Sequence, residues 1–243
     1  AGVVPTPAIA YLVRTHGYDA GVVISASHNS FEHNGIKYFN KDGYKLSDEI
    51  EERIEAIILD NAEKIDCPTH ENIGHISQAD DLVRDYINFA KSTIDCRLDG
   101  LRIAIDCANG ASSVTAEKAL TELGAEVVAI NNKPDGININ DNCGSTHMEG
   151  LMKFVKENSF DAGLAFDGDA DRVLAVDENG EYVDGDKIMA ICALDMRERG
   201  LLSDNTVVAT VMSNLGFFIM GKDKNLEKKR TKVGDRYVIE EML

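Results

Sequence analysis

The residues after about position 100 alternate between strand-like and helix-like segments, and this alternation most restricts the fold. Apolar runs of strand length lie at 101–105, 125–130 and 161–166, and segments with helical periodicity lie between them at 113–123 and 148–157. Repeated βα units of this kind form mostly parallel sheets with right-handed crossovers. The sequence therefore predicts an α/β fold whose ligand loops lie at the carboxyl ends of the strands.

Similar elements are expected on both sides of this central part. In chain order they are a helix opened by Pro5 and Pro7 and running through Val13, a strand ending at Ser25, a helix beginning at Ser47, a polar exit segment from Cys67 to His75, a helix from Ala79 to Ser92, a helix from Gly185 to Arg199, a linker from Leu201 to Asn205 and a strand over Thr206–Val211. This pattern predicts three units, at residues 1–77, 78–202 and 203–243.

Three aspartates alternate with small residues in the run Asp167-Gly-Asp-Ala-Asp-Arg172, which lies between the strand-like segments 161–166 and 173–176. Two carboxylates ~4 Å apart repel by about 4 kcal/mol at an effective dielectric constant of about 20, so a loop that gathers three of them needs a cation. Hard oxygen ligands favour Mg²⁺ or Ca²⁺ over zinc or copper. The alternative is a solvated acidic turn, but the position between two strands favours a ligand loop.

The same run has the spacing of an EF-hand, because Asp167, Asp169, Asp171 and Glu178 fall at the first, third, fifth and twelfth loop positions. The sixth position, however, is Arg172 where the sharp turn of an EF-hand needs glycine. An EF-hand loop also joins two helices, whereas this one joins strand-like segments. The spacing alone therefore does not indicate an EF-hand.

A second group of polar residues, Ser25-Ala-Ser-His-Asn29, follows the apolar run 21–24. A hydroxyl, an imidazole and an amide at the end of a buried strand can carry and bind phosphate. The alternative is an ordinary turn whose side chains satisfy the local backbone. Farther along, Asn34-Gly-Ile-Lys37 predicts a turn followed by a lysine that could supply a positive charge for phosphate.

Other motifs are interpreted as structural. Asp106-Cys-Ala-Asn-Gly110 lacks the lysine and glycine spacing of a P-loop and predicts a βα turn. The basic run Asn225–Arg230 predicts a solvated face before the next strand. The five cysteines are odd in number and contain no C-x-x-C pair, so neither a disulfide framework nor a zinc site is indicated.

The net charge of −17, from 25 basic and 42 acidic residues, argues against nucleic acid and anionic membranes as partners. A phosphate ligand would therefore need a local positive pocket. The candidate side chains for it are His28, Lys37, Arg172, Lys232 and Arg236. The composition is that of a cytoplasmic protein, and it leaves a homo-oligomer open.

Four segments together resemble the α-D-phosphohexomutase superfamily. Ser25–Asn29, Asn34–Lys37, Asp167–Arg172 and Lys232–Val238 are similar, in the same chain order, to its phosphoserine loop, lysine-bearing turn, metal loop and sugar-side loop. The resemblance implies repeated three-layer α/β/α domains with mixed, mostly parallel sheets. It also implies that residues 1–77 are the C-terminal part of a phosphoserine domain, 78–202 a metal-binding domain and 203–243 the start of a sugar-binding domain.

The resemblance also implies the site residues. Ser27, rather than Ser25 or Ser30, would be the phosphoacceptor. The expected catalytic set is Ser27, His28, Lys37 and Arg172; the expected Mg²⁺ ligands are Asp167, Asp169, Asp171 and the phosphorylated Ser27; and the expected substrate-binding residues are Gly234, Asp235 and Arg236. His28 is a candidate for the general base, which the sequence does not identify.

The activity implied is that of an isomerase that moves a phosphoryl group within a sugar through a phosphoserine and a 1,6-bisphosphate. Cys143-Gly-Ser-Thr-His147 and the run Gly234–Val238 are most similar to the members that interconvert glucosamine 6-phosphate and glucosamine 1-phosphate. The alternatives are mannose or glucose phosphates as substrates, and a non-catalytic metal-binding module. Members of the superfamily are considerably longer, so the chain is expected to be an excerpt that is not fully active by itself.

Overall fold

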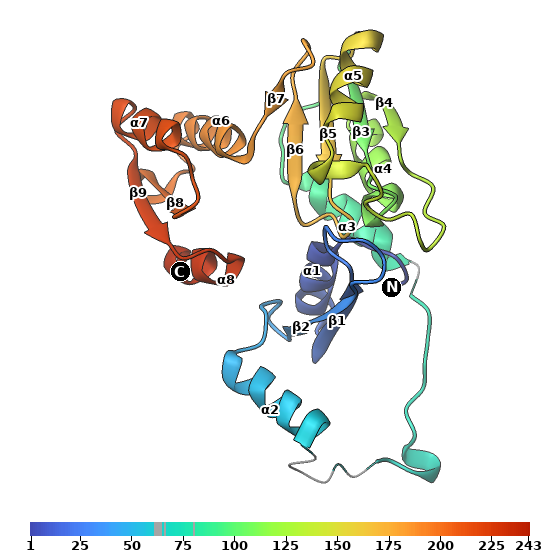
Figure 1. The fold of residues 1–243 in the computed structure, drawn as a ribbon. Helices are drawn as coiled ribbons and strands as arrows, with labels where there is room; N and C mark the ends of the chain where they lie inside the picture. The colour runs from blue at the N-terminus through green and yellow to red at the C-terminus, as the bar shows by residue number, and fades with distance from the viewer. Residues whose placement is uncertain (61–64, 66, 80) are drawn as a thin grey trace.

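The structure, a computed structural model, describes residues 1–60, 65, 67–79 and 81–243. Its α-helices are α1 (Thr6–His16), α2 (Asp48–Asp60), α3 (Asp81–Ser92), α4 (Ala116–Glu122), α5 (Glu149–Asn158), α6 (Gly185–Glu198), α7 (Leu215–Asp223) and α8 (Asp235–Met242). Its strands are β1 (Ala20–Ser25), β2 (Gly35–Asn40), β3 (Arg102–Asp106), β4 (Glu126–Ile130), β5 (Ala162–Phe166), β6 (Val173–Val176), β7 (Tyr182–Val183), β8 (Thr206–Thr210) and β9 (Glu227–Thr231). Figure 1 shows a first group around β1 and β2, a second group formed by the central sheet β3–β7 and its helices, and a third group around β8 and β9.

The central sheet has the order β4-β3-β5-β6-β7, with β3 parallel to both β4 and β5 and with β6 and β7 antiparallel. Successive side chains of a strand point to opposite faces. Ala104 therefore joins the core under α5, while Ile103 and Ile105 join the core on the α4 side. Helices cover both faces, which confirms the predicted three-layer α/β/α arrangement with a mixed sheet.

The aspartate run forms the connection between β5 and β6. These strands pair antiparallel with Phe166 opposite Val173, so residues 167–172 close a short loop at the carboxyl end of β5. The predicted strand-to-strand position is confirmed. Because the loop joins two strands rather than two helices, an EF-hand is excluded.

The first group contains α1 and the antiparallel pair β1–β2. The prediction that Asn34–Lys37 forms a turn is wrong, because β2 begins at Gly35 and Lys37 pairs with Val23 in the ladder. The connection is formed instead by residues 26–34. Strand pairing over 35–40 satisfies the backbone groups that a turn would leave to solvent, and it places Lys37 on a rigid element.

The third group contains the parallel pair β8–β9 and the helices α7 and α8. The basic run 225–230 was predicted to precede the next strand, but residues 227–231 are the strand itself. Long basic side chains can lay their apolar stems on a neighbouring helix. The Arg230 guanidinium lies 3.6 Å from the ring centre of Phe218 on α7, and a Cβ on Gly221 of α7 would meet the stem of Lys228.

The predicted sugar-side loop Lys232–Val238 is also partly helical. Gly234 has φ +136° and precedes α8, which begins at Asp235. An aspartate in the first turn is stabilised by the unpaired N–H groups and by the positive end of the helix dipole. The loop therefore ends at the glycine, and Asp235 and Arg236 lie on a helix.

The remaining predicted elements are confirmed with shifted ends. α1 extends from the predicted end at Val13 to His16, and the predicted helix 113–123 is divided into a 3₁₀ turn and α4. Residue 80, near the predicted start of α3, lies outside the described residues. None of the helices formed by the described residues combines the length and hydrophobicity that crossing a membrane requires.

Candidate active site

Two loops that are distant in the sequence meet where α1 and β1 approach the central sheet (Figure 1). The backbone N–H of Thr6, the first residue of α1, donates to the carbonyl of Asp169 at 2.9 Å. The side-chain amide of Asn140 donates to the carbonyl of Ser27 at 2.9 Å. The serine loop after β1 and the aspartate loop after β5 therefore form one site, as their positions at strand ends suggested.

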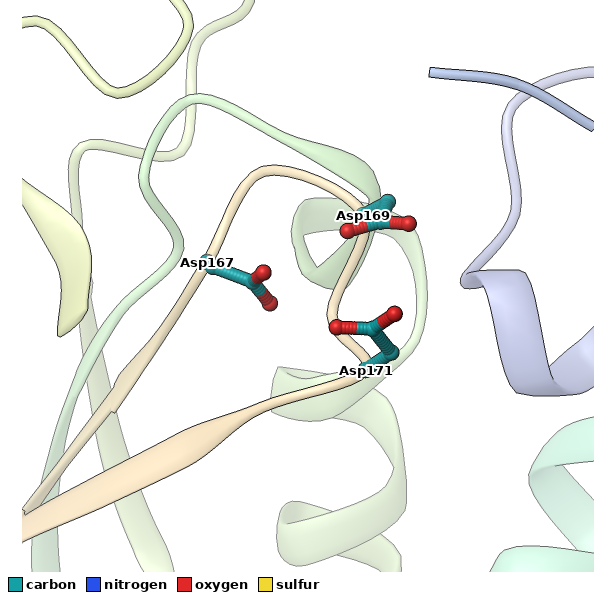
Figure 2. A group of neighbouring side chains, drawn as sticks. All are labelled: Asp167, Asp169 and Asp171. Atoms are coloured by element: carbon teal, nitrogen blue, oxygen red, sulfur yellow. The ribbon is translucent and has the colours of Figure 1, made fainter. Parts of the chain in front are cut away.

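The three aspartates gather their carboxylates in this site, as Figure 2 shows. One oxygen of each of Asp167, Asp169 and Asp171 lies within 4.8 Å of the others. Asp167 and Asp169 are buried, and Oδ2 of Asp167 and Oδ1 of Asp169 have no hydrogen-bond partner among the described residues. Buried charged oxygens without a partner are costly unless a cation binds them. The donor set and its unpaired oxygens therefore fit a hard divalent cation.

The pKa values of the two buried aspartates shift in opposite directions. Burial, with the charges of Asp171 and Asp169, raises the pKa of Asp167 to about 6. Burial also acts on Asp169, but hydrogen bonds from Lys37, Thr6 and Ser25 outweigh it and lower the pKa of that carboxyl. Hydrogen-bond donors therefore concentrate on Asp169. Asp167 accepts a hydrogen bond from the backbone N–H of Arg172 at 3.1 Å and has Nε of the same arginine 3.6 Å from its Oδ2, which does not offset its burial.

Lys37 lies against the aspartates. Its Nζ donates to Oδ2 of Asp169 at 2.6 Å and to Oδ2 of Asp171 at 3.0 Å. Burial would lower the pKa of Lys37, but these two hydrogen bonds outweigh it and raise the pKa. The predicted lysine thus belongs to the site, and strand β2 rather than a turn carries it there.

Ser27, His28 and Arg172 form the other half of the site. Nη2 of Arg172 donates to Oγ of Ser27 at 3.3 Å and lies 3.0 Å from Nδ1 of His28. Because a guanidinium cannot accept a hydrogen bond, Nδ1 of His28 is the acceptor and the proton of the neutral ring is on Nε2. The same nitrogen of His28 is 3.5 Å from Oγ of Ser27. The arginine next to the aspartates therefore contacts the serine hydroxyl directly.

Thr6 is a residue of the site that sequence reasoning missed. Its hydroxyl donates to Oδ2 of Asp169, the same oxygen that Lys37 contacts. The contact joins residues 163 positions apart. In the sequence Thr6 lies between two prolines at a helix start, and that pattern carries no signal for a carboxylate partner.

Two of the three predicted substrate-binding residues, Asp235 and Arg236, line a neighbouring pocket, and Gly234 precedes them at the start of α8. Asp235 pairs with Lys45 at 2.7 Å, and Arg236 pairs with Asp48 and Glu240. They line a cavity of about 390 Å³ between the β2–α2 connection and α8. Burial would raise the pKa of Asp235, but Lys45 and, with a smaller effect, the charge of Lys37 lower it. These residues thus contact the first group rather than the serine and aspartate loops.

The turn at residues 106–110 supports the aspartate loop. The N–H of Ala111 donates to the carbonyl of Gly168 at 2.8 Å. The buried carboxylate of Asp106 accepts from the N–H of Ala108 at 2.9 Å and from the side-chain amide of Asn131 at 3.0 Å. The motif is the predicted βα turn, and the residue that follows it bonds to the backbone of the aspartate loop.

We expect Gly110→Ala to destabilise the protein. A Cβ at this position would lie 2.1 Å from the backbone carbonyl oxygen of Gly168, which cannot rotate away. Overpacking against fixed groups costs about 1–3 kcal/mol, so the urea midpoint should fall. Gly150→Ala is the control, because a Cβ added there, in the first turn of α5, would have nothing within 4 Å. Equal urea midpoints for the two variants would contradict the close approach.

Comparison with known proteins assigns each part of the chain to one family. Residues 1–65, 84–180 and 184–243 match the α/β/α domains I, II and III of phosphoglucomutase/phosphomannomutase. The phosphoglucosamine mutase of Acetivibrio thermocellus is 62% identical over 242 residues, which are 100% of this chain and 54% of that protein. The chain thus spans about half the length of the curated relatives it matches.

Solved structures share the fold. A phosphoglucomutase/phosphomannomutase family protein from Burkholderia thailandensis superposes with a TM-score of 0.80 at 23% identity, over 98% of this chain and 52% of that one. An N-acetylphosphoglucosamine mutase from Aspergillus fumigatus, in complex with GlcNAc-6P and magnesium, superposes with a TM-score of 0.58 at 18% identity, over 97% of this chain and 61% of that one. With the three domain matches, these findings establish that the chain belongs to the phosphoglucomutase/phosphomannomutase family, the α-D-phosphohexomutases that its motifs resemble.

Proposed function

We propose that the protein is a phosphoglucosamine mutase, which interconverts glucosamine 6-phosphate and glucosamine 1-phosphate. The observation that carries the proposal is the position of the Ser27 hydroxyl, 3.3 Å from Arg172, whose guanidinium also pairs with the three-aspartate loop. In this loop, Asp167 and Asp169 each have a buried oxygen without a hydrogen-bond partner among the described residues. A phosphoryl group on this serine would bring the anionic oxygens that such a pocket needs. The 62% identity to a phosphoglucosamine mutase supports the amino sugar as substrate.

The metal in this proposal is Mg²⁺. Asp167, Asp169 and Asp171 would hold it together with one phosphoryl oxygen on Ser27, because hard oxygen donors and near-octahedral coordination are what Mg²⁺ prefers. The bound ion would withdraw negative charge from the phosphoester during transfer. The magnesium in the Aspergillus fumigatus enzyme supports this choice of cation.

The chain's own residues would position and neutralise the transferred group. The bond between Ser27 Oγ and phosphorus breaks as a sugar hydroxyl oxygen bonds to phosphorus. The hydroxyl proton passes to a base, for which His28 is the candidate once its Nδ1 no longer accepts from Arg172, and a proton is returned to the serine oxygen that is released. Arg172 donates to the leaving oxygen of the serine. The sugar 1,6-bisphosphate then turns over and returns its other phosphoryl group to Ser27, so the reaction is an isomerisation without net hydrolysis.

The three units would divide the work. In this proposal residues 1–77 carry the phosphoserine, 78–202 bind the metal, and 203–243 begin the sugar-binding domain, with Gly234, Asp235 and Arg236 contacting the sugar. The cavity that Lys45, Asp235 and Arg236 line is the candidate for these sugar contacts. Phosphorylated sugars are charged and do not cross membranes unaided, so the enzyme would act in the cytoplasm.

Two measurements test the proposal. The intact mass of the purified protein should rise by one phosphoryl group after incubation with glucose 1,6-bisphosphate and Mg²⁺. Turnover of glucosamine 1-phosphate should then exceed turnover of mannose 1-phosphate and glucose 1-phosphate. A higher rate with mannose or glucose phosphate would favour the alternative substrates, and the absence of any phosphoryl increment would contradict the mutase mechanism.

A further inference from the structure

Ser27 has an unusual backbone conformation that needs support from outside its own loop. Its φ is +53°, in the left-handed region that residues other than glycine rarely adopt. Within the loop, Oγ of Ser25 accepts a hydrogen bond from the N–H of Ser27 at 2.8 Å. The hydroxyl oxygen of Ser25 thus holds the N–H of Ser27, whereas the carbonyl oxygen of Ser27 bonds outside the loop.

Asn140, 113 residues away, provides that partner. Its Nδ2 donates to the carbonyl of Ser27 at 2.9 Å and to the carbonyl of Asn29 at 2.8 Å. The residue is only 8% exposed, so water does not compete well for these bonds. Both amide protons are therefore committed to the backbone of the serine loop.

Asn140 is itself fixed to the central sheet. Its backbone N–H donates to the carbonyl of Ala108, in the turn after β3, at 2.9 Å. A Cβ on Gly168 would meet the carbonyl oxygen of Ser27 at 2.6 Å and Nδ2 of Asn140 at 2.7 Å. The serine loop, the aspartate loop and Asn140 therefore meet without space between them, and Asn140 bonds to the first while touching the second.

We propose that Asn140 is a positioning residue, which sets the location of the Ser27 hydroxyl relative to the aspartate loop. This inference rests on the proposed function, in which Ser27 carries the phosphoryl group. An amide is needed at this position because it donates two hydrogen bonds to two carbonyl oxygens, whereas a carboxylate of the same shape would repel both. Asn140 acts through Ser27 and does not itself contact the transferred group.

The test compares Asn140→Ala and Asn140→Asp with Asn142→Ala. Asn142 is a matched control, because it has a left-handed φ of +51° in the same loop and its exposed amide donates to the adjacent Asp141. Each alanine variant therefore introduces similar backbone strain. The probes are phosphorylation of Ser27 by glucose 1,6-bisphosphate, followed by intact mass, and the Kd for Mg²⁺.

Both Asn140 variants should slow phosphorylation about 100-fold relative to Asn142→Ala, because a displacement of about 1 Å at a reacting group has an effect of this size. Their Tm values should lie several degrees below that of the control, because two carbonyl oxygens lose their donor, but both variants should fold and their Kd for Mg²⁺ should be unchanged. Asn140→Asp should be at least as slow as Asn140→Ala, because of the repulsion between oxygens.

Two results would overturn the proposal. One is a phosphorylation rate equal to that of Asn142→Ala. The other is a loss of folding, Mg²⁺ binding and rate in the same proportion, which would make Asn140 a residue of general structural importance. The wild-type protein is measured first: if it takes up no phosphate, the proposed function fails, and the positioning role fails with it.

Discussion

Ser27→Ala should abolish phosphoryl uptake from glucose 1,6-bisphosphate, and with it mutase turnover. The hydroxyl removed is the one that Arg172 contacts at 3.3 Å, and alanine offers no oxygen to accept the group. Intact-mass measurement should show no phosphoryl increment in the variant. The fold should be retained, because the N–H of residue 27 still donates to Oγ of Ser25 and its carbonyl still accepts from Asn140, and neither bond involves the side chain of residue 27.

Ser30→Ala is the control for this substitution. The Ser30 hydroxyl lies in the same loop but is exposed and 3.1 Å from Nδ1 of His33. This variant should take up phosphate like the wild-type protein. A phosphoryl increment that persists in Ser27→Ala, and that peptide mapping places on Ser25 or Ser30, would show that the assignment of Ser27 is wrong.

Asp169→Asn should weaken Mg²⁺ binding and phosphoryl transfer together, each by about 100-fold or more, since loss of an outer-shell partner alone costs about 10–100-fold. Oδ2 of Asp169 already accepts from Lys37 and Thr6, so the asparagine oxygen will remain there. The new NH₂ group then replaces Oδ1, the buried oxygen without a partner. A donor would face the cation in place of an anionic ligand.

The matched control is Asp195→Asn, which removes the same charge from an exposed pair with Arg199 on α6. It should leave both the Kd for Mg²⁺ and the transfer rate unchanged. Isothermal titration with Mg²⁺ and single-turnover transfer at limiting Mg²⁺ provide the two readouts. Wild-type transfer by Asp169→Asn at limiting Mg²⁺ would contradict a three-aspartate metal site.

The secondary structure of the central sheet and the position of the aspartate loop could be predicted from the sequence, because both depend on residues that are close in the chain. The alternation of Ile103, Ala104 and Ile105 places successive side chains on two covered faces, so a strand between two helical layers could be predicted. The aspartate run was predictable as a ligand loop, because its carboxylates repel one another and strand-like segments flank it. The family resemblance then connected Ser27 with that loop.

Only the tertiary structure decided which distant residues support the site. Thr6 and Asn140 contact partners 163 and 113 residues away, and neither belongs to a periodic pattern that a sequence can display. The charged strand β9 was also missed, because its packing against α7 outweighs the low strand propensity of its residues. The start of α8 at Asp235 was missed as well, because the aspartate is stabilised there by the N-terminal end of the helix. Hydrophobic periodicity reports which face of an element is buried, whereas a polar contact between loops depends on how separately formed units pack together.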